Sequence, residues 1–213
     1  MPFSGQVCFA QTRILALRSR LDEIADAYVR AIGSLRIGDP WNPQTQVGPV
    51  LNARQLDRIL NYIAQGGQQG GQILVGGGRS ENFNRGFFID PAVFANVTPE
   101  MTILREEIFG PVVTIQAYDD EEEAVRIAND TDLGLSGSVY SRDVEHAYEI
   151  ACQIRTGQVG INGVELAHKF SGVGREGDRR GSRRSLKQNL SSCPSRDKEY
   201  PTDSLHLRPT IKP

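Results

Sequence analysis

The sequence reads Val112-Val113-Thr114-Ile115-Gln116-Ala117-Tyr118-Asp119-Asp120-Glu121-Glu122-Glu123 in the middle of the chain. The first six residues predict an extended segment, and the five acids predict the start of a helix. Carboxylates in a first turn complement the positive end of the helix dipole, so these acids need no functional explanation. The apolar face of this helix comes from Ala124, Val125, Ile127 and Ala128.

The same alternation of extended and helical segments continues on both sides of this junction. Ser19 is predicted to cap one helix and Asn52 a second one, which Gly66-Gly67 would end. The other predicted segments are extended at 14–17, 73–75, 87–89, 136–140 and 159–162, and helical at 144–154. Helix-length connections between strands predict an α/β fold, with a mostly parallel open sheet and helices on both faces.

The composition is that of one globular domain followed by a different tail. The chain has 213 residues, of which 38% are hydrophobic, and this is enough for one core. The net charge is −2, yet residues 178–213 carry nine Lys or Arg against four Asp or Glu. Because this stretch is poor in apolar residues, we expect a disordered tail. Its charges are scattered without interleaved aromatic residues, which argues against nucleic acid or a membrane as a partner.

The cysteines and the N-terminus indicate a cytoplasmic protein. Cys8, Cys152 and Cys193 form no short-spaced pair, which argues against a disulfide framework or a zinc site and favours reduced thiols. No metal site is predicted, since no cysteine stands at metal-ligand spacing from His146, His168 or His206. The N-terminus has no basic region, and no apolar run approaches the roughly 18 residues of a membrane span.

Two separated motifs connect the chain with a known family. The first is Gly5-Gln6-Val7-Cys8-Phe9-Ala10-Gln11-Thr12-Arg13, and the second is Arg105-Glu106-Glu107-Ile108-Phe109-Gly110-Pro111-Val112. In this order and at this distance they resemble the catalytic, C-terminal half of the aldehyde dehydrogenase superfamily. The resemblance extends to Gly160-Ile161-Asn162-Gly163. It implies the family's fold, an aldehyde substrate, and NAD or NADP as cofactor.

The resemblance also implies roles for five residues. Cys8 would be the nucleophile that attacks the aldehyde, Glu107 would accept hydrogen bonds from the nicotinamide ribose, and Phe109 would pack near the nicotinamide ring. Gln55 and Arg58 would make weaker contacts with the adenosine ribose. Each residue also has a simpler explanation: Cys8 as a small buried hydrophobe, Glu107 as a surface carboxylate, Phe109 as core, and Gln55 and Arg58 as a solvated helix face.

The family pattern breaks towards the C-terminus. Residues 1–177 are interpreted as a truncated catalytic domain with a short internal deletion near 167–168, because the match resumes over 169–177. Beyond residue 177 the match ends, and Arg180-Gly181-Ser182-Arg183-Arg184-Ser185 stands where relatives carry a Glu-Gly-Leu-Glu-Glu-like stretch. We hypothesise that residues 178–213 are an out-of-frame translation product.

The 213 residues contain neither a Rossmann-like cofactor domain nor the Glu-Leu-Gly-Gly-Lys-like segment that carries the family's general base. We therefore expect an aldehyde dehydrogenase family oxidoreductase in the form of a fragment that is inactive alone. Two alternatives remain open. One is a residual thiol esterase acylated at Cys8, and the other is a non-catalytic subunit that forms a homo-oligomer or pairs with a separate N-terminal half. The sequence specifies neither the aldehyde nor the choice between NAD and NADP.

Overall fold

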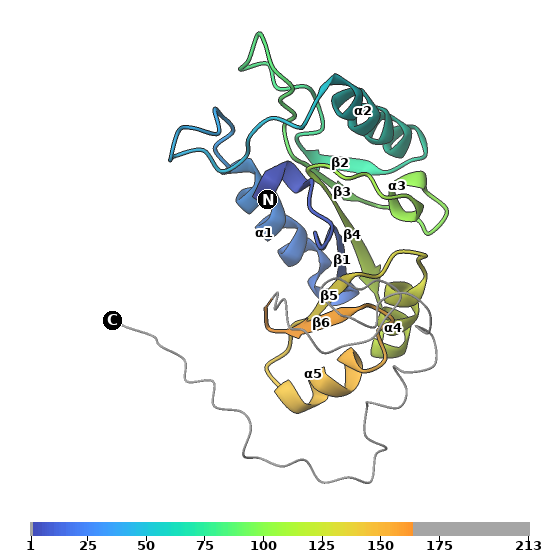
Figure 1. Ribbon diagram of the computed structural model, residues 1–213. Coiled ribbons are helices and arrows are strands. Elements are labelled where there is room, and N and C mark those ends of the chain that lie inside the picture. The colour runs from blue at the N-terminus through green and yellow to red at the C-terminus, as the bar shows by residue number, and fades with distance from the viewer. Residues whose placement is uncertain (1, 164–213) are drawn as a thin grey trace, which may run out of the picture.

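The computed structural model describes residues 2–163 (Figure 1). The predicted tail over 178–213 and the predicted deletion near 167–168 lie outside these residues.

A four-stranded sheet forms the centre of the described chain. Its strands are β1 (Arg13–Leu17), β4 (Val112–Tyr118), β3 (Ala92–Ala95) and β2 (Gln72–Val75), in that spatial order. Strand β4 runs parallel to both β1 and β3, whereas the edge strand β2 runs antiparallel to β3. The predicted α/β fold with a mostly parallel open sheet is confirmed, and β2 is the exception within it.

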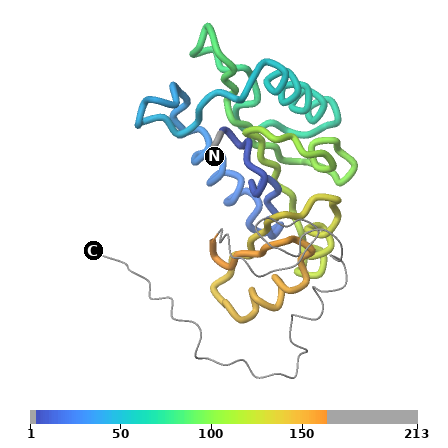
Figure 2. Tube along the Cα trace, in the orientation of Figure 1, coloured from blue at the N-terminus to red at the C-terminus, as the bar shows by residue number. Residues whose placement is uncertain are grey.

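Helices cover both faces of this sheet, as predicted (Figures 1 and 2). Helix α1 (Leu21–Gly33) packs on one face, over a core that includes Val93 and Ile115. Helix α2 (Ala53–Gln68) and the short α3 (Thr102–Arg105) pack on the other face, over a core that includes Phe94 and Val112. Val93 and Phe94 are neighbours in β3 and serve different cores, because successive side chains of a strand point to opposite faces.

Strand β3 is a central strand that the sequence analysis missed. The extended segment predicted at 87–89 contributes only one isolated bridge, between Ile89 and Arg79. The strand itself begins at Ala92, and Ala92, Val93 and Phe94 are all fully buried. Four residues with alanine at each end have weak strand propensity, so only the packing on both sides identifies this strand.

The predicted helix ends are partly right. The Asn52 side chain accepts a 2.9 Å hydrogen bond from the Gln55 backbone N–H, which confirms the cap of α2. Ser19 is no cap, because it lies in the 3-10 turn η2 (Arg18–Arg20) and α1 starts without a side-chain cap. Gly66-Gly67 does not end α2, which continues to Gln68. A Cβ at Gly66 would lie 2.9 Å from the Ile103 side chain, so this glycine permits the close approach of α2 to α3.

A second, two-stranded parallel sheet follows the first. After α4 (Glu121–Asn129) come β5 (Ser136–Val139), α5 (Val144–Ala151) and β6 (Gln158–Ile161), and β5 pairs with β6. The acids predicted to start α4 do so, with Asp120 accepting a 2.8 Å hydrogen bond from the Glu123 backbone N–H. Figure 1 shows this unit beyond the end of β1 and β4. None of the described helices is long and apolar enough to cross a membrane.

Candidate active site

Cys8 lies in an exposed turn between the 3-10 helix η1 (Pro2–Gly5) and β1. The turn is closed by a 3.1 Å hydrogen bond from the Ala10 backbone N–H to the Val7 carbonyl. Because the residue is exposed, its explanation as a small buried hydrophobe is wrong. An exposed thiol outside regular secondary structure can be reached by a small-molecule substrate.

The segment before Cys8 is attached to the loop that leads into α2. The Ser4 hydroxyl is buried and donates a 2.7 Å hydrogen bond to the Gly48 carbonyl. Two residues later, the Gln6 side-chain carbonyl accepts a 2.8 Å hydrogen bond from the Leu51 backbone N–H. Both bonds join parts of the chain more than 40 residues apart, and they fix the start of the turn that carries Cys8.

Gly5 brings the Cys8 segment against the second motif. A Cβ on Gly5 would lie 2.3 Å from the Gly110 carbonyl oxygen and 2.8 Å from the Pro111 nitrogen, so the two backbones touch. Gly5 also has φ of 74°, a left-handed conformation that favours glycine. Cys8 follows Gly5 by three residues, and its Cα therefore lies within about 11 Å of the Gly5 Cα. The two motifs, a hundred residues apart, thus share one neighbourhood.

Glu107 and Phe109 are both exposed in the segment between α3 and β4. Within the described chain, the Glu107 carboxylate has no hydrogen bond or ion pair. Phe109 has φ of 55°, a left-handed conformation that costs a non-glycine residue energy, and its side chain is 37% exposed. Its explanation as a core residue is therefore wrong. For Glu107 the explanation as a surface carboxylate fits the structure as well as the functional one does.

Arg58 attaches α2 to the backbone of this segment. Its guanidinium donates hydrogen bonds to the carbonyls of Glu107 and Ile108. It also lies over the Tyr62 ring, with 4.7 Å between the guanidinium carbon and the ring centroid. Arg58 is thus not simply part of a solvated helix face, because its hydrogen bonds hold the backbone of Glu107 and Ile108 in place.

Tyr62 is a member of this network that the sequence analysis did not single out. Its hydroxyl donates a 2.6 Å hydrogen bond to a Glu106 carboxylate oxygen, and this bond raises the pKa of Tyr62. Tyr62 follows Arg58 by one helical turn, and the Arg58 guanidinium lies 3.3 Å from its hydroxyl. The four-residue spacing is the one signal that could have linked the pair.

Gln55 lies one turn before Arg58 and carries an unsatisfied polar atom. Its side-chain carbonyl oxygen is buried without a hydrogen-bond partner among the described residues. Because this oxygen is closed to solvent, a ribose hydroxyl does not reach it in the described chain. The Glu107 carboxylate is exposed and is an acceptor of the kind that a ribose diol needs, and the exposed Phe109 ring offers a flat apolar face. The Arg58 donors, in contrast, are engaged with the backbone.

Arg105, which opens the second motif, anchors it to the end of α4. Its guanidinium binds both carboxylate oxygens of Asp130, at 2.9 and 2.8 Å. This pairing lowers the pKa of Asp130 and raises that of Arg105. A bidentate pair fixes orientation as well as position, so the motif is held at its start by Asp130 and near its centre by Arg58.

No group of three metal-ligating side chains occurs in the part of the chain that the structure describes. Cys152 is the C-cap residue of α5. His146 lies in α5 and is bound to Glu121 of α4, while His168 and His206 lie outside the described residues.

The chain is similar to known proteins in sequence and in fold. The model of the aldehyde dehydrogenase family matches residues 1–190. The chain is 46% identical over 172 residues to a geranial dehydrogenase of Castellaniella defragrans, covering 80% of the chain and 36% of that protein. It is 39% identical over 183 residues to a betaine aldehyde dehydrogenase of Brucella ovis, covering 81% and 38%. A crystal structure of a Mycobacterium tuberculosis aldehyde dehydrogenase complexed with NAD+ matches with a TM-score of 0.76 at 48% identity, covering 79% of this chain and 35% of that one. The chain thus spans little more than a third of the length of these relatives.

Proposed function

Because the chain belongs to the aldehyde dehydrogenase family, we propose that it carries the nucleophile and the nicotinamide-facing part of an aldehyde-oxidising site. The overall reaction converts an aldehyde, water and NAD or NADP into a carboxylate and the reduced cofactor. The observation that carries this proposal is the backbone contact between Gly5 and Gly110, since it joins the segment of Cys8 to the segment of Glu107.

Cys8 is the proposed nucleophile, acting as a thiolate. Its sulfur forms a bond to the aldehyde carbon, and the carbonyl π electrons move to oxygen, which gives a thiohemiacetal. The backbone N–H of Cys8 is the proposed donor to this oxyanion, and such a donor typically contributes about 100-fold or more in rate. Loss of hydride leaves a thioester on Cys8, which water converts into the carboxylate and the thiol.

Three residues are proposed to hold the cofactor, which supplies the hydride acceptor when bound. Glu107 accepts hydrogen bonds from the nicotinamide ribose, Phe109 packs near the nicotinamide ring, and Gln55 accepts from the adenosine ribose. The exposed and unpaired carboxylate of Glu107 supports its role, whereas the role of Gln55 follows from the family resemblance alone, because its side-chain oxygen is buried. The contacts of Arg58 favour a positioning role, in which it fixes the backbone of Glu107, over the direct ribose contact predicted from the resemblance.

The 213-residue chain by itself is proposed to be inactive as a dehydrogenase, because no general-base segment was recognised in it. The exposure of Cys8 favours one residual activity, which is acylation by an activated ester. Pairing with a separate N-terminal half, assembly into a homo-oligomer and a cytoplasmic location stay predictions from the sequence.

The nucleophile is tested by mixing the pure chain with p-nitrophenyl acetate. We expect a burst of nitrophenol without steady turnover, and its loss in Cys8→Ser but not in Cys193→Ser. With an aldehyde and NAD we expect no NADH. A burst that survives Cys8→Ser contradicts the assignment of Cys8, and steady NADH formation that Cys8→Ser abolishes contradicts the inactivity of the chain.

The cofactor residues are tested separately by titrating the chain with NAD and following the ligand by saturation-transfer NMR. Glu107→Gln removes a charged acceptor and is expected to weaken binding by about 10-fold or more. Glu122→Gln, an exposed glutamate in the first turn of α4, is the matched control and should bind as the parent chain does. Equal affinities of the two variants would speak against a cofactor contact at Glu107.

A further inference from the structure

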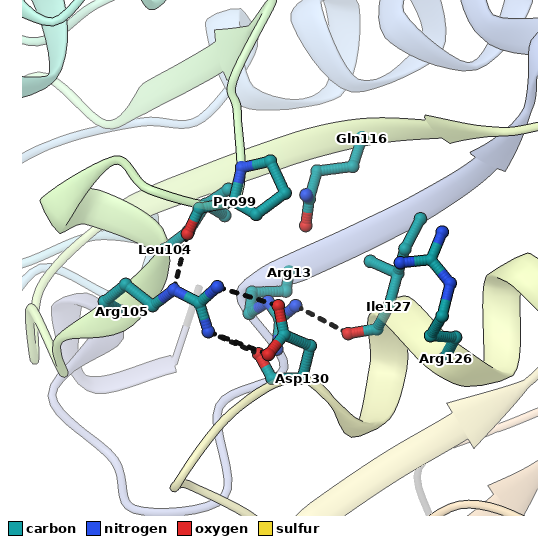
Figure 3. Close-up of a pocket in the computed structure, with 8 residues that line it drawn as sticks. All are labelled: Arg13, Pro99, Leu104, Arg105, Gln116, Arg126, Ile127 and Asp130. Atoms are coloured by element: carbon teal, nitrogen blue, oxygen red, sulfur yellow. Dashed lines mark hydrogen bonds and ion pairs between the residues drawn. The ribbon is translucent and has the colours of Figure 1, made fainter.

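A small cavity lies beneath α3 and the end of α4, on the sheet face opposite α1 (Figure 3). Its floor is formed by Arg13 of β1 and Gln116 of β4, and its walls include Leu104, Ile127 and the Arg105–Asp130 pair. In the register of these parallel strands Arg13 pairs with Thr114 and Leu15 with Gln116, so Arg13 and Gln116 point to the same face. The cavity thus lies over the strand that follows Cys8 and the strand that follows Glu107.

Two residues that line this cavity each carry a polar atom without a hydrogen-bond partner among the described residues. The Nε–H of Arg13 and the Oε1 of Gln116 are both buried and make no hydrogen bond with any residue that the structure describes. Gln116 is 6% exposed. The remaining Arg13 contact is a 2.9 Å hydrogen bond from Nη2 to the Ile127 carbonyl. Burial lowers the pKa of Arg13, against the influence of Asp130.

One atom of the pair is a donor and the other is an acceptor, which restricts what can satisfy both. A halide accepts from Arg13 but cannot donate to the Gln116 carbonyl. A carboxylate likewise has no hydrogen to donate to the Gln116 carbonyl, and the volume that the centre of a water-sized sphere can reach in the cavity is about 20 Å³. A water molecule accepts from Arg13 and donates to Gln116, and it needs about 10–15 Å³ of such volume with two to four polar partners.

We propose that this cavity is a binding site for one structural water molecule, which bridges Arg13 Nε–H in β1 and Gln116 Oε1 in β4. The water completes a polar contact that ties β1 to β4 beside the Arg105–Asp130 pair. It stabilises the two strands next to the motif segments, because β1 starts five residues after Cys8 and β4 starts three residues after Phe109. The inference does not depend on the proposed function, since it concerns the fold alone.

The direct test is a crystal structure of the 213-residue chain, grown once in chloride-free buffer and once with sodium bromide. We expect one density peak within hydrogen-bonding distance of both Arg13 Nε and Gln116 Oε1 in each crystal, without anomalous signal from bromide. A dry cavity overturns the proposal. An anomalous bromide peak also overturns it, because the rotated Gln116 amide would then donate to an anion together with Arg13.

A variant tests the same bridge in solution. Gln116→Met keeps the length of the side chain and removes the acceptor, so the buried Arg13 Nε–H loses the water. We expect the thermal midpoint to fall by about 2–6 °C, as is typical for the loss of a buried hydrogen bond in a chain of this size. The control Gln68→Met, at an exposed position in α2, should leave the midpoint within about 1 °C, as surface substitutions usually do. Equal midpoints for the two variants contradict the bridge, and the water peak of the parent crystal tests it even if Gln116→Met does not fold.

Discussion

Arg58 holds the carbonyls of Glu107 and Ile108, which belong to two successive peptide groups. A guanidinium offers five N–H groups in a rigid plane, and it can therefore bind two neighbouring acceptors at once while stacking on Tyr62. Glu107 has no other contact that fixes its side chain within the described chain. The orientation of this carboxylate thus depends on its backbone, and the backbone depends on Arg58.

Arg58→Ala is expected to loosen the segment from Glu106 to Gly110 without unfolding the chain. Two hydrogen bonds from a charged donor are lost, so amide hydrogen exchange in this segment should accelerate by about 10-fold or more. The measurement is exchange followed by mass spectrometry. Arg54→Ala, at an exposed position one turn earlier, is the matched control. If Arg58→Ala leaves amide hydrogen exchange in this segment unchanged, Arg58 has no positioning role.

Tyr62→Phe removes the hydroxyl that donates to Glu106 and leaves the ring under Arg58. We expect the free energy of unfolding to fall by about 1 kcal/mol, the usual net value of a hydrogen bond. Urea denaturation measures it, with Tyr140→Phe as the control because that ring is 69% exposed. If both variants lose the same stability, the Tyr62–Glu106 bond contributes nothing specific.

Three of the five candidate residues are visible in the sequence because a motif carries them, and the other two, Gln55 and Arg58, come from the wider family resemblance. Cys8, Glu107 and Phe109 lie within two contiguous motifs, and the resemblance selects them without knowledge of the fold. Tyr62, Gln116 and the Arg58 contacts depend on which side chains meet after folding. A glutamine in a strand or a tyrosine in an amphipathic helix has the same local pattern whether or not its polar atom finds a partner.

At the scale of elements, α4 and α5 are joined by His146. Its Nε2 lies 2.8 Å from both carboxylate oxygens of Glu121, and Glu149 lies 3.6 Å from Nδ1. The hydrogen bond to Glu121 is the main cause of the raised pKa of His146. This contact links the two-stranded sheet unit to the helix that follows β4.

The pH dependence of stability should carry the signature of this contact. Because the folded pKa of His146 is raised above its unfolded value of about 6.5, its stabilisation is fully present below that value. It is lost as the pH rises through the higher folded pKa. We expect the thermal midpoint of the parent chain to fall relative to His146→Gln across this window. If the thermal midpoint of the parent chain rises relative to that of His146→Gln as the pH increases, the predicted direction is wrong.

Long elements with a clear apolar period were predictable, and short or context-dependent ones were not. Helix α2 follows from its periodicity and from Asn52 as its cap, and α4 follows from its periodicity and from the run of acids at its start. Strand β3 was missed because its burial on both faces comes from helices distant in sequence. The local pattern at Gly66-Gly67 predicts the end of a helix. The helix α2 nevertheless continues through both glycines, and α3 packs closely against Gly66.

At the scale of the whole molecule, the contact between Gly5 and Gly110 joins the N-terminal segment to the centre of the chain. Gly110 is itself buried against α2, where a Cβ would lie 2.5 Å from Ile59 Cδ1. Three layers therefore meet at this point: η1, the second motif and α2. No local pattern encodes such a contact, and only the family resemblance indicated that the two motifs belong together.

Gly5→Ala should displace the Cys8 segment. The new Cβ meets backbone atoms at 2.3 Å, and the positive φ adds about 1–2 kcal/mol of strain. We expect faster hydrogen exchange over 4–12 and a lower free energy of unfolding. Gly78→Ala is the matched control, since nothing lies within 4 Å of its Cβ position. Equal behaviour of the two variants would mean that the N-terminal segment is not docked on Gly110.

Large apolar side chains that are exposed in the described chain favour the predicted pairing with an N-terminal half. Trp41 is 93% exposed and Leu51 is 77% exposed, and Leu51 belongs to the loop that binds the Cys8 segment. Co-expression with the part of the geranial dehydrogenase that this chain does not cover should raise the soluble yield, and the two pieces should co-purify. Trp41→Ser together with Leu51→Ser should improve the solubility of the chain expressed alone. If the two pieces do not co-purify, the predicted pairing with an N-terminal half is contradicted.

The central claim is that Cys8 and Glu107 belong to one site. The most direct test places spin labels on Cys8 and on Glu107→Cys, in a chain with Cys152→Ser and Cys193→Ser, and records the continuous-wave EPR spectrum. The close approach of the two motifs predicts dipolar broadening in the doubly labelled folded chain, which should vanish in denaturant. A spectrum equal to the sum of the two singly labelled chains would contradict the account.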